Sequence, residues 1–155
     1  MNAEQVKIMQ EELEARFRKL NVETAWLKGE EGQIGETLRA LLPVSDAGDC
    51  MLLEVMVTHL DEDMDLLDLF MSLIMEVGPG YEELKEAMLD WNVDSPIGTF
   101  GIYRPSRLFY HRYTFPFPRT ALPEELASQA SYLIDRCYSV AATVFPEAVR
   151  ISGHS

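Results

Sequence analysis

Apolar residues recur every three or four positions in three parts of the chain, which is the spacing of an amphipathic helix. The pattern predicts helices over Ala3–Leu20, over Tyr81–Asn92 and over a long segment that starts at Pro123. Asn2 and Gln5 are placed to form the capping box of the first helix. Pro146 is expected to end the last helix, because a proline inside a helix removes a backbone hydrogen bond.

Five other segments are rich in β-forming residues or alternate apolar and polar positions, and these predict strands. The segments are 22–27, 37–42, 50–59, 99–103 and 107–115. The last two are joined by "RPSR", in which Pro105 takes the second position of a β-turn, so they predict a hairpin.

The segment 64–77 fits a helix and a strand equally well. Asp68, Ser72 and Glu76 recur every four residues, as on one polar face of a helix, while alternate apolar residues give an unbroken apolar face at strand spacing. Periodicity alone leaves both open. In either case strands and helices do not alternate strictly. The expected fold is therefore α+β, with an antiparallel sheet of about five or six strands and helices packed on it.

Length, composition and charge narrow the class of protein. The chain has 155 residues, of which 47% are hydrophobic and 25% charged, so we expect one globular domain over 1–155. It contains no apolar run near the ~18 residues of a membrane span. Cys50 and Cys137 are far apart in the sequence, which favours two reduced thiols in a cytoplasmic protein. A net charge of −13 argues against nucleic acid and membrane partners.

One part of this acidic chain is basic. Between Ser95 and Pro123 it carries four arginines and no acidic residue. The predicted hairpin within this stretch supplies the candidate partner-binding residues Arg104, Arg107, Tyr110, His111 and Arg112. Strand alternation places His111 on one face and Tyr110 and Arg112 on the other.

Two states of these arginines remain open. Buried arginine is costly unless it is paired, so we expect exposed or acid-paired positions. The acidic residues Asp61, Glu62, Asp63, Asp65 and Asp68 could meet the arginines within one subunit or across a dimer. Solvated arginines on an outer strand are the alternative.

Motifs for catalysis and metal binding fail on spacing. Asp61, Asp63 and Asp65 alternate as in a calcium loop, but Leu66 and Ser72 stand where that loop needs glycine and glutamate. The three histidines, His59, His111 and His154, lie in no recognisable metal or nucleophile motif. We therefore expect no catalytic residue, no metal and no cofactor.

Three short motifs carry a family resemblance. They are "MLDWN" (88–92), "IGTFGIY" (97–103) and "LFYHRYTFPFP" (108–118). With them, the chain from about Leu38 to Pro118 resembles the YbjN-type bacterial proteins, whose domain is grouped with type III secretion chaperone-like folds. The resemblance implies a strand over 64–77 and an α+β domain that is often a homodimer, with no catalytic residue to carry over.

These observations lead to two hypotheses. The first is a non-catalytic protein-binding module, chaperone-like or regulatory, that acts as a homodimer on an unidentified client protein. The second is a small enzyme or ligand-binding protein with a pocket between the sheet and the C-terminal helix. Convergence of Tyr110, His111 and Arg112 on a buried pocket would favour the second. An exposed apolar groove or flat patch would favour the first.

Overall fold

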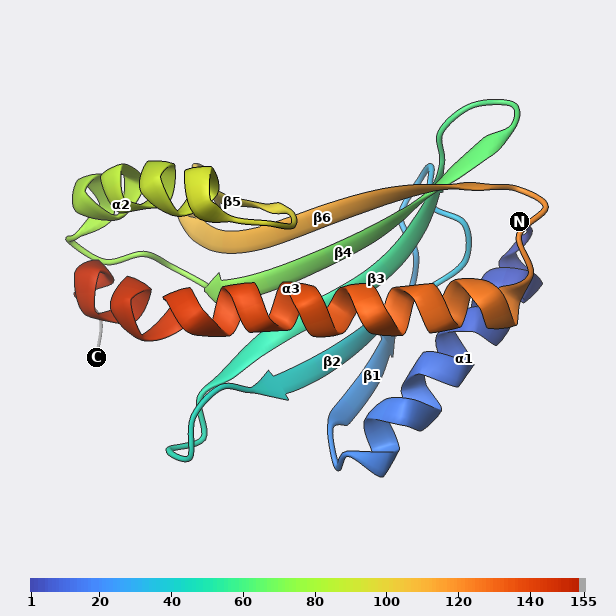
Figure 1. Cartoon of the computed structure of the whole chain (residues 1–155), viewed down its shortest axis with the longest axis horizontal. Coiled ribbons are helices and arrows are strands. Elements are labelled where there is room, and N and C mark those ends of the chain that lie inside the picture. Colours follow the sequence, from blue (N-terminus) through green and yellow to red (C-terminus); the bar gives the residue numbers. More distant parts are fainter. Residues whose placement is uncertain (154–155) are drawn as a thin grey trace.

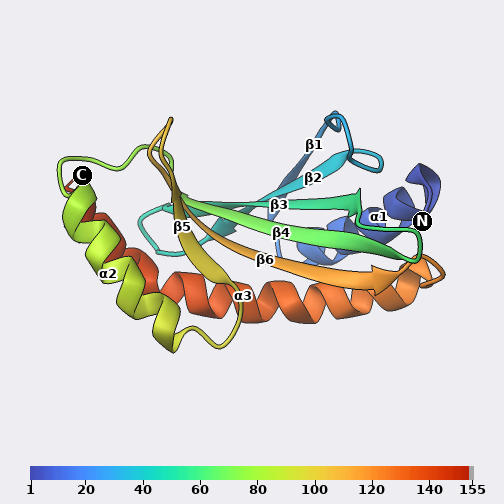
Figure 2. The ribbon, with the colours of Figure 1, turned by 90° about the horizontal axis from the view of Figure 1, so that it is seen from above.

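The computed structural model describes residues 1–153, which form one antiparallel sheet with its helices on one side (Figures 1 and 2). His154, one of the three histidines considered above, lies outside the described residues. In chain order the elements are α1 (Ala3–Lys19), β1 (Glu23–Leu27), β2 (Thr37–Pro43), β3 (Cys50–His59), β4 (Met64–Ile74), α2 (Tyr81–Asp94), β5 (Thr99–Tyr103), β6 (Leu108–Pro118) and α3 (Pro123–Ser152).

The sheet has six strands in the order β1-β2-β3-β4-β6-β5, so the predicted α+β class and strand number are confirmed. The ambiguous segment 64–77 contributes the strand β4. β4 pairs with β3 on one edge and with β6 on the other. These two ladders provide hydrogen-bond partners for the backbone of β4 over most of its length. The pairing with β6 cannot be read from a local sequence pattern, because β6 lies far along the chain.

The helices form a second layer. α3 runs across the sheet, with α1 on one flank and α2 near its C-terminal end (Figure 1). The predicted capping box of α1 is present, since Asn2 and Gln5 exchange hydrogen bonds between side chain and backbone. Glu14 of α1 accepts hydrogen bonds from Thr24 and Trp26 of β1 and so ties the helix to the edge of the sheet.

The prediction that Pro146 ends the last helix is wrong. α3 continues to Ser152 and ends at Gly153, which has φ 77°. A proline inside a helix costs about 3 kcal/mol. The turns beyond it bury Ala148 and Ile151, and burial of such apolar side chains is the compensating gain. Figure 2 shows α3 bending toward α2 over its last turns, which is the usual effect of an internal proline.

One edge of the sheet is only partly covered. β6 extends to Pro118, beyond the predicted end at 115, whereas β5 pairs only with Leu108–Arg112 of β6. Residues 113–118 therefore have a partner strand, β4, on one side only. Pro116 and Pro118 lie in this half, as expected for prolines, which sheets tolerate mainly at edges.

Candidate protein-binding surfaces

The basic hairpin has the alternation that the sequence predicts. His111 lies opposite Met71 and Phe100 on the side of the sheet that the helices cover, and it is fully buried. Tyr110 and Arg112, its neighbours in β6, point to the other side. These three side chains do not converge on a common pocket.

His111 is a core residue, which corrects its place among the partner-binding candidates. Its Nε2 lies 2.9 Å from the Ile97 carbonyl oxygen, and its Nδ1 is buried without a hydrogen-bond partner. Gly98, at φ 67°, lies so close that a Cβ there would be 2.5 Å from the ring. Burial lowers the pKa of His111 below its ordinary value of 6.5, against a smaller opposing effect of the Ile97 carbonyl.

Arg112 is paired with Asp68 within one subunit. Its Nε and Nη2 donate to the two carboxylate oxygens at 3.1 and 2.7 Å, a bidentate arrangement. These hydrogen bonds raise the pKa of Arg112 above its ordinary value. The arginine side chain remains 48% exposed, whereas that of Asp68 is 11% exposed. The pair therefore forms a fixed, locally neutral part of the surface.

Arg104 and Arg107 both lie in the hairpin turn, but they differ in their contacts. Arg107 has a left-handed backbone (φ 60°), donates to the Gly78 carbonyl oxygen at 3.0 Å, and packs its guanidinium 4.5 Å from the ring centre of Tyr81. It therefore holds the β4–α2 connection against the turn. Arg104 is exposed, and within residues 1–153 its side chain has no hydrogen bond or ion pair.

The acidic turn between β3 and β4 is held by its own chain. Asp61 accepts hydrogen bonds from the backbone N–H groups of Asp63 and Met64 at 2.9 and 2.8 Å. This is the arrangement of an Asx turn, and it accounts for Asp61 without a metal ion. Across residues 1–153, no group of three His, Cys, Asp or Glu side chains is placed to hold a metal.

Asp65 is the buried centre of a charged cluster beside this turn. Its carboxylate lies 2.6 Å from the α-amino group of Met1, 2.9 Å from Nδ1 of His59 and 3.3 Å from Nε of Arg119. Burial by itself raises the pKa of Asp65, but the hydrogen bonds and charges of Met1 and His59 hold it below its ordinary value. The fourth arginine of the basic stretch is thus also paired within the subunit.

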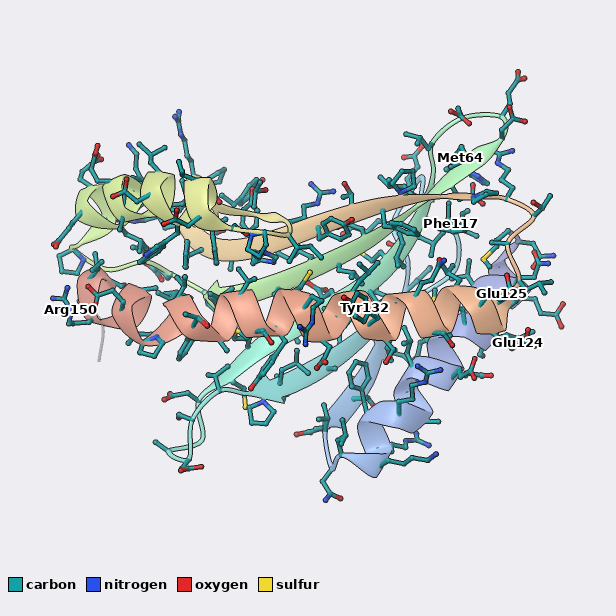
Figure 3. The ribbon with its side chains drawn as sticks, in the orientation of Figure 1. Met64, Phe117, Glu124, Glu125, Tyr132 and Arg150 are labelled. Carbon is teal, nitrogen blue, oxygen red and sulfur yellow. The ribbon has the colours of Figure 1, made fainter. Side chains whose placement is uncertain are left out.

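An apolar groove lies between α1 and α3, and we call it the helix groove. It consists of two hollows of about 450 and 250 Å³ that share Phe17, Leu20, Ile134 and Asp135 in their linings. Leu20 is 73% exposed, and Tyr132, in the N-terminal half of α3 (Figure 3), is 66% exposed. Sequence analysis did not select Tyr132, because it lies off the apolar stripe of its helix. An aromatic residue at such a position is expected to be exposed, and this could have identified it.

The second surface is the side of the sheet without helices, and we call it the open face. Its apolar residues include Leu41, Leu52, Met56, Leu66, Phe70 and Tyr110. Phe70 and Tyr110 stack with ring centres 4.7 Å apart. The Tyr110 ring lies over Gly101 of β5, where a Cβ would be 2.5 Å from the hydroxyl oxygen.

No protein-family model and no curated protein matches this sequence. None of the helices in residues 1–153 combines the length and the apolar character that crossing a bilayer requires.

Proposed function

We propose that this protein is a non-catalytic protein-binding module, chaperone-like or regulatory, that acts as a dimer in the cytoplasm. The observation that carries the proposal is the helix groove, where the apolar side chain of Leu20 and the ring of Tyr132 remain largely exposed. Exposed apolar patches and tyrosines are features of protein interaction sites. Two free cysteines, Cys50 and Cys137, fit a reducing compartment.

The groove suits an apolar segment of another protein. Its floor is made of Leu13, Phe17 and Ile134, while Arg16 and Asp135 lie among the lining residues as polar groups of either charge. An apolar centre with a polar rim is the usual anatomy of an interface. We propose that one or two apolar side chains of a client protein occupy the two hollows.

The competing hypothesis of an enzyme or small-ligand protein receives less support. It needs convergent polar groups in a buried pocket between sheet and α3. Tyr110 and Arg112 lie on the open face and His111 lies in the core, on opposite sides of the sheet. Nucleic acid is an equally poor partner, because three of the four arginines in the basic stretch are engaged within the subunit.

Site-specific photo-crosslinking in the native host tests the client-binding role. A photoreactive amino acid placed at Tyr132 is expected to capture a defined protein, and Leu20→Asp in the same chain is expected to abolish that capture. The matched control places the probe at Val93 of α2, which is 84% exposed and far along the chain from the groove. Equal capture at both positions, or capture that Leu20→Asp leaves unchanged, would refute the groove as a client site.

A further inference from the structure

The strands β3 and β4 carry apolar residues on both of their faces, although helices cover only one. Toward the helices they bury Leu53, Val55, Leu67 and Leu69. Toward the open face they present Leu52, Met56, Leu66 and Phe70, all half-buried. An antiparallel sheet with one solvated face normally alternates apolar and polar residues, whereas strands covered on both faces are apolar throughout. Although Glu54, Thr58, Asp68 and Ser72 also point to the open face, the large apolar residues there are more than one solvated face normally carries.

The central part of the open face is also electrically neutral. In the four central strands, β2, β3, β4 and β6, the charged residues that point to this face are Arg39, Glu54, Asp68 and Arg112. They form two ion pairs, with Arg39 Nε 3.1 Å from Glu54 and Arg112 Nη2 2.7 Å from Asp68. The chain as a whole has a net charge of −13. Neutral, largely apolar surface is therefore concentrated on this side.

From these two observations we infer that the open face is the interface with a second copy of this chain, the two sheets packing face to face. A second copy also carries −13, so it can approach only where repulsion is small, and the open face meets that condition. A different partner would be selected by charges complementary to unpaired groups. Here the four charges are already paired within the subunit, which leaves apolar contact as the attraction.

The size of the face fits a stable dimer. Six strands about 4.8 Å apart and about eight residues long span roughly 29 by 26 Å, or about 750 Å². Standard interfaces bury about 800 Å² on each partner. Two sheets that pack face to face lie about 10 Å apart with their side chains interdigitating, and the stacked rings of Phe70 and Tyr110 supply such side chains near the middle of the face.

Sedimentation equilibrium at micromolar concentration tests this inference, which rests on the dimer in the proposed function. We expect the wild type at twice the chain mass of 17.6 kDa. Phe70→Lys and Leu52→Lys are each expected to raise the dimer dissociation constant tenfold or more, because a two-fold interface contains each substitution twice. Leu41→Lys, at a residue already 39% exposed, is a milder change on the same face in case the others fail to fold.

The control is Leu89→Lys on α2, which replaces an equally apolar residue that is 58% exposed outside the open face. It should leave the dimer intact, and circular dichroism should show all compared variants folded. A wild-type dimer whose dissociation constant is unchanged in the folded open-face variants overturns the inference and leaves the proposed function standing. A monomeric wild type overturns both the inference and the proposed dimer. A monomer that instead binds a different protein through Phe70 overturns the second copy as the occupant.

Discussion

The side-chain amide of Asn92 pairs with the backbone of Phe100 as a neighbouring strand would. Its Nδ2 donates to the Phe100 carbonyl oxygen at 3.0 Å, and the Phe100 N–H donates to its Oδ1 at 2.6 Å. Phe100 belongs to β5, the last strand of the sheet. The amide therefore occupies hydrogen-bonding positions on an edge that would otherwise be open, and it anchors the end of α2 to the sheet.

Asn92→Ala is expected to lower the free energy of unfolding by about 1–3 kcal/mol, because it leaves both backbone groups of Phe100 without their partner. Urea denaturation gives this quantity directly. Val93→Ala, the next residue of α2 and 84% exposed, is the matched control and should change stability by less than about 0.5 kcal/mol. Similar losses in the two variants would contradict a specific role for the Asn92 amide.

Arg107→Ala is expected to destabilise the fold by about 2 kcal/mol. It removes the hydrogen bond to the Gly78 carbonyl oxygen and the stacking on Tyr81, and the charged hydrogen bond is the larger of these contributions. Arg104→Ala, in the same turn but exposed, should leave stability within about 0.5 kcal/mol. If thermal or urea unfolding ranks the two variants in the opposite order, the assignment of Arg107 to a structural role is wrong.

Stability should fall as the pH drops below about 6.5. The pKa of His111 is lowered in the folded protein by burial, so below its ordinary value of 6.5 the unfolded chain binds a proton that the folded chain resists. For this single group the loss is at most about 1.4 kcal/mol per pH unit, and it ends below the pKa of His111 in the folded protein. Above the ordinary pKa of histidine the residue makes no pH-dependent contribution.

His111→Phe should flatten this dependence between about pH 7 and 5, even if the variant is less stable overall. Asp65 does not interfere in that window. Its pKa is lowered from 3.8, so the stability it contributes is present above about pH 4 and is lost only at lower pH. An equally steep slope in the variant would assign the effect to another group.

The two cysteines should differ sharply in reactivity. Burial raises the pKa of the Cys137 thiol to about 12, whereas Cys50 is exposed at the start of β3. Since the thiolate is the reactive form, a thiol reagent at neutral pH should modify only Cys50 in the folded protein and both residues in denaturant. Rapid modification of Cys137 without denaturant would show that the core under α3 opens readily.

Chelation should leave the fold unaffected. Asp61 accepts hydrogen bonds from backbone N–H groups, and Asp65 is paired with basic groups. Thermal melts with and without EDTA should therefore give the same midpoint within error. A drop of several degrees would reveal a bound cation at this turn.

Local patterns predicted most of the elements and their faces. Alternation placed His111 and Arg112 on opposite sides of β6, and helical spacing together with a capping box predicted α1. These features depend on residues close in sequence. The Gly78 partner of Arg107 and the Met1 partner of Asp65 lie 29 and 64 residues away, so no local pattern could identify them.

One wrong prediction and one pattern that periodicity left open have the same physical origin. Pro146 is a helix breaker by propensity, yet the burial of Ile151 beyond it keeps α3 helical. The double periodicity of 64–77 is resolved only by the strands on either side of β4. In both cases tertiary contacts outweigh the local preference. The apolar character of Leu66 and Phe70 was evident in the sequence. Only the structure shows that no helix within residues 1–153 covers the side of the sheet on which they lie.

The prolines in residues 113–118 of β6, which have a partner strand on one side only, affect whether this protein can form assemblies larger than a dimer. Contact between the open faces of two subunits ends at a dimer, because each subunit has one such face. Pairing along a strand edge can instead repeat indefinitely and yields fibres. Pro116 and Pro118 have no N–H to offer an incoming strand. If both were replaced with valine, residues 113–118 are expected to pair with the edge strand of another molecule. The two proline rings therefore act against polymerisation.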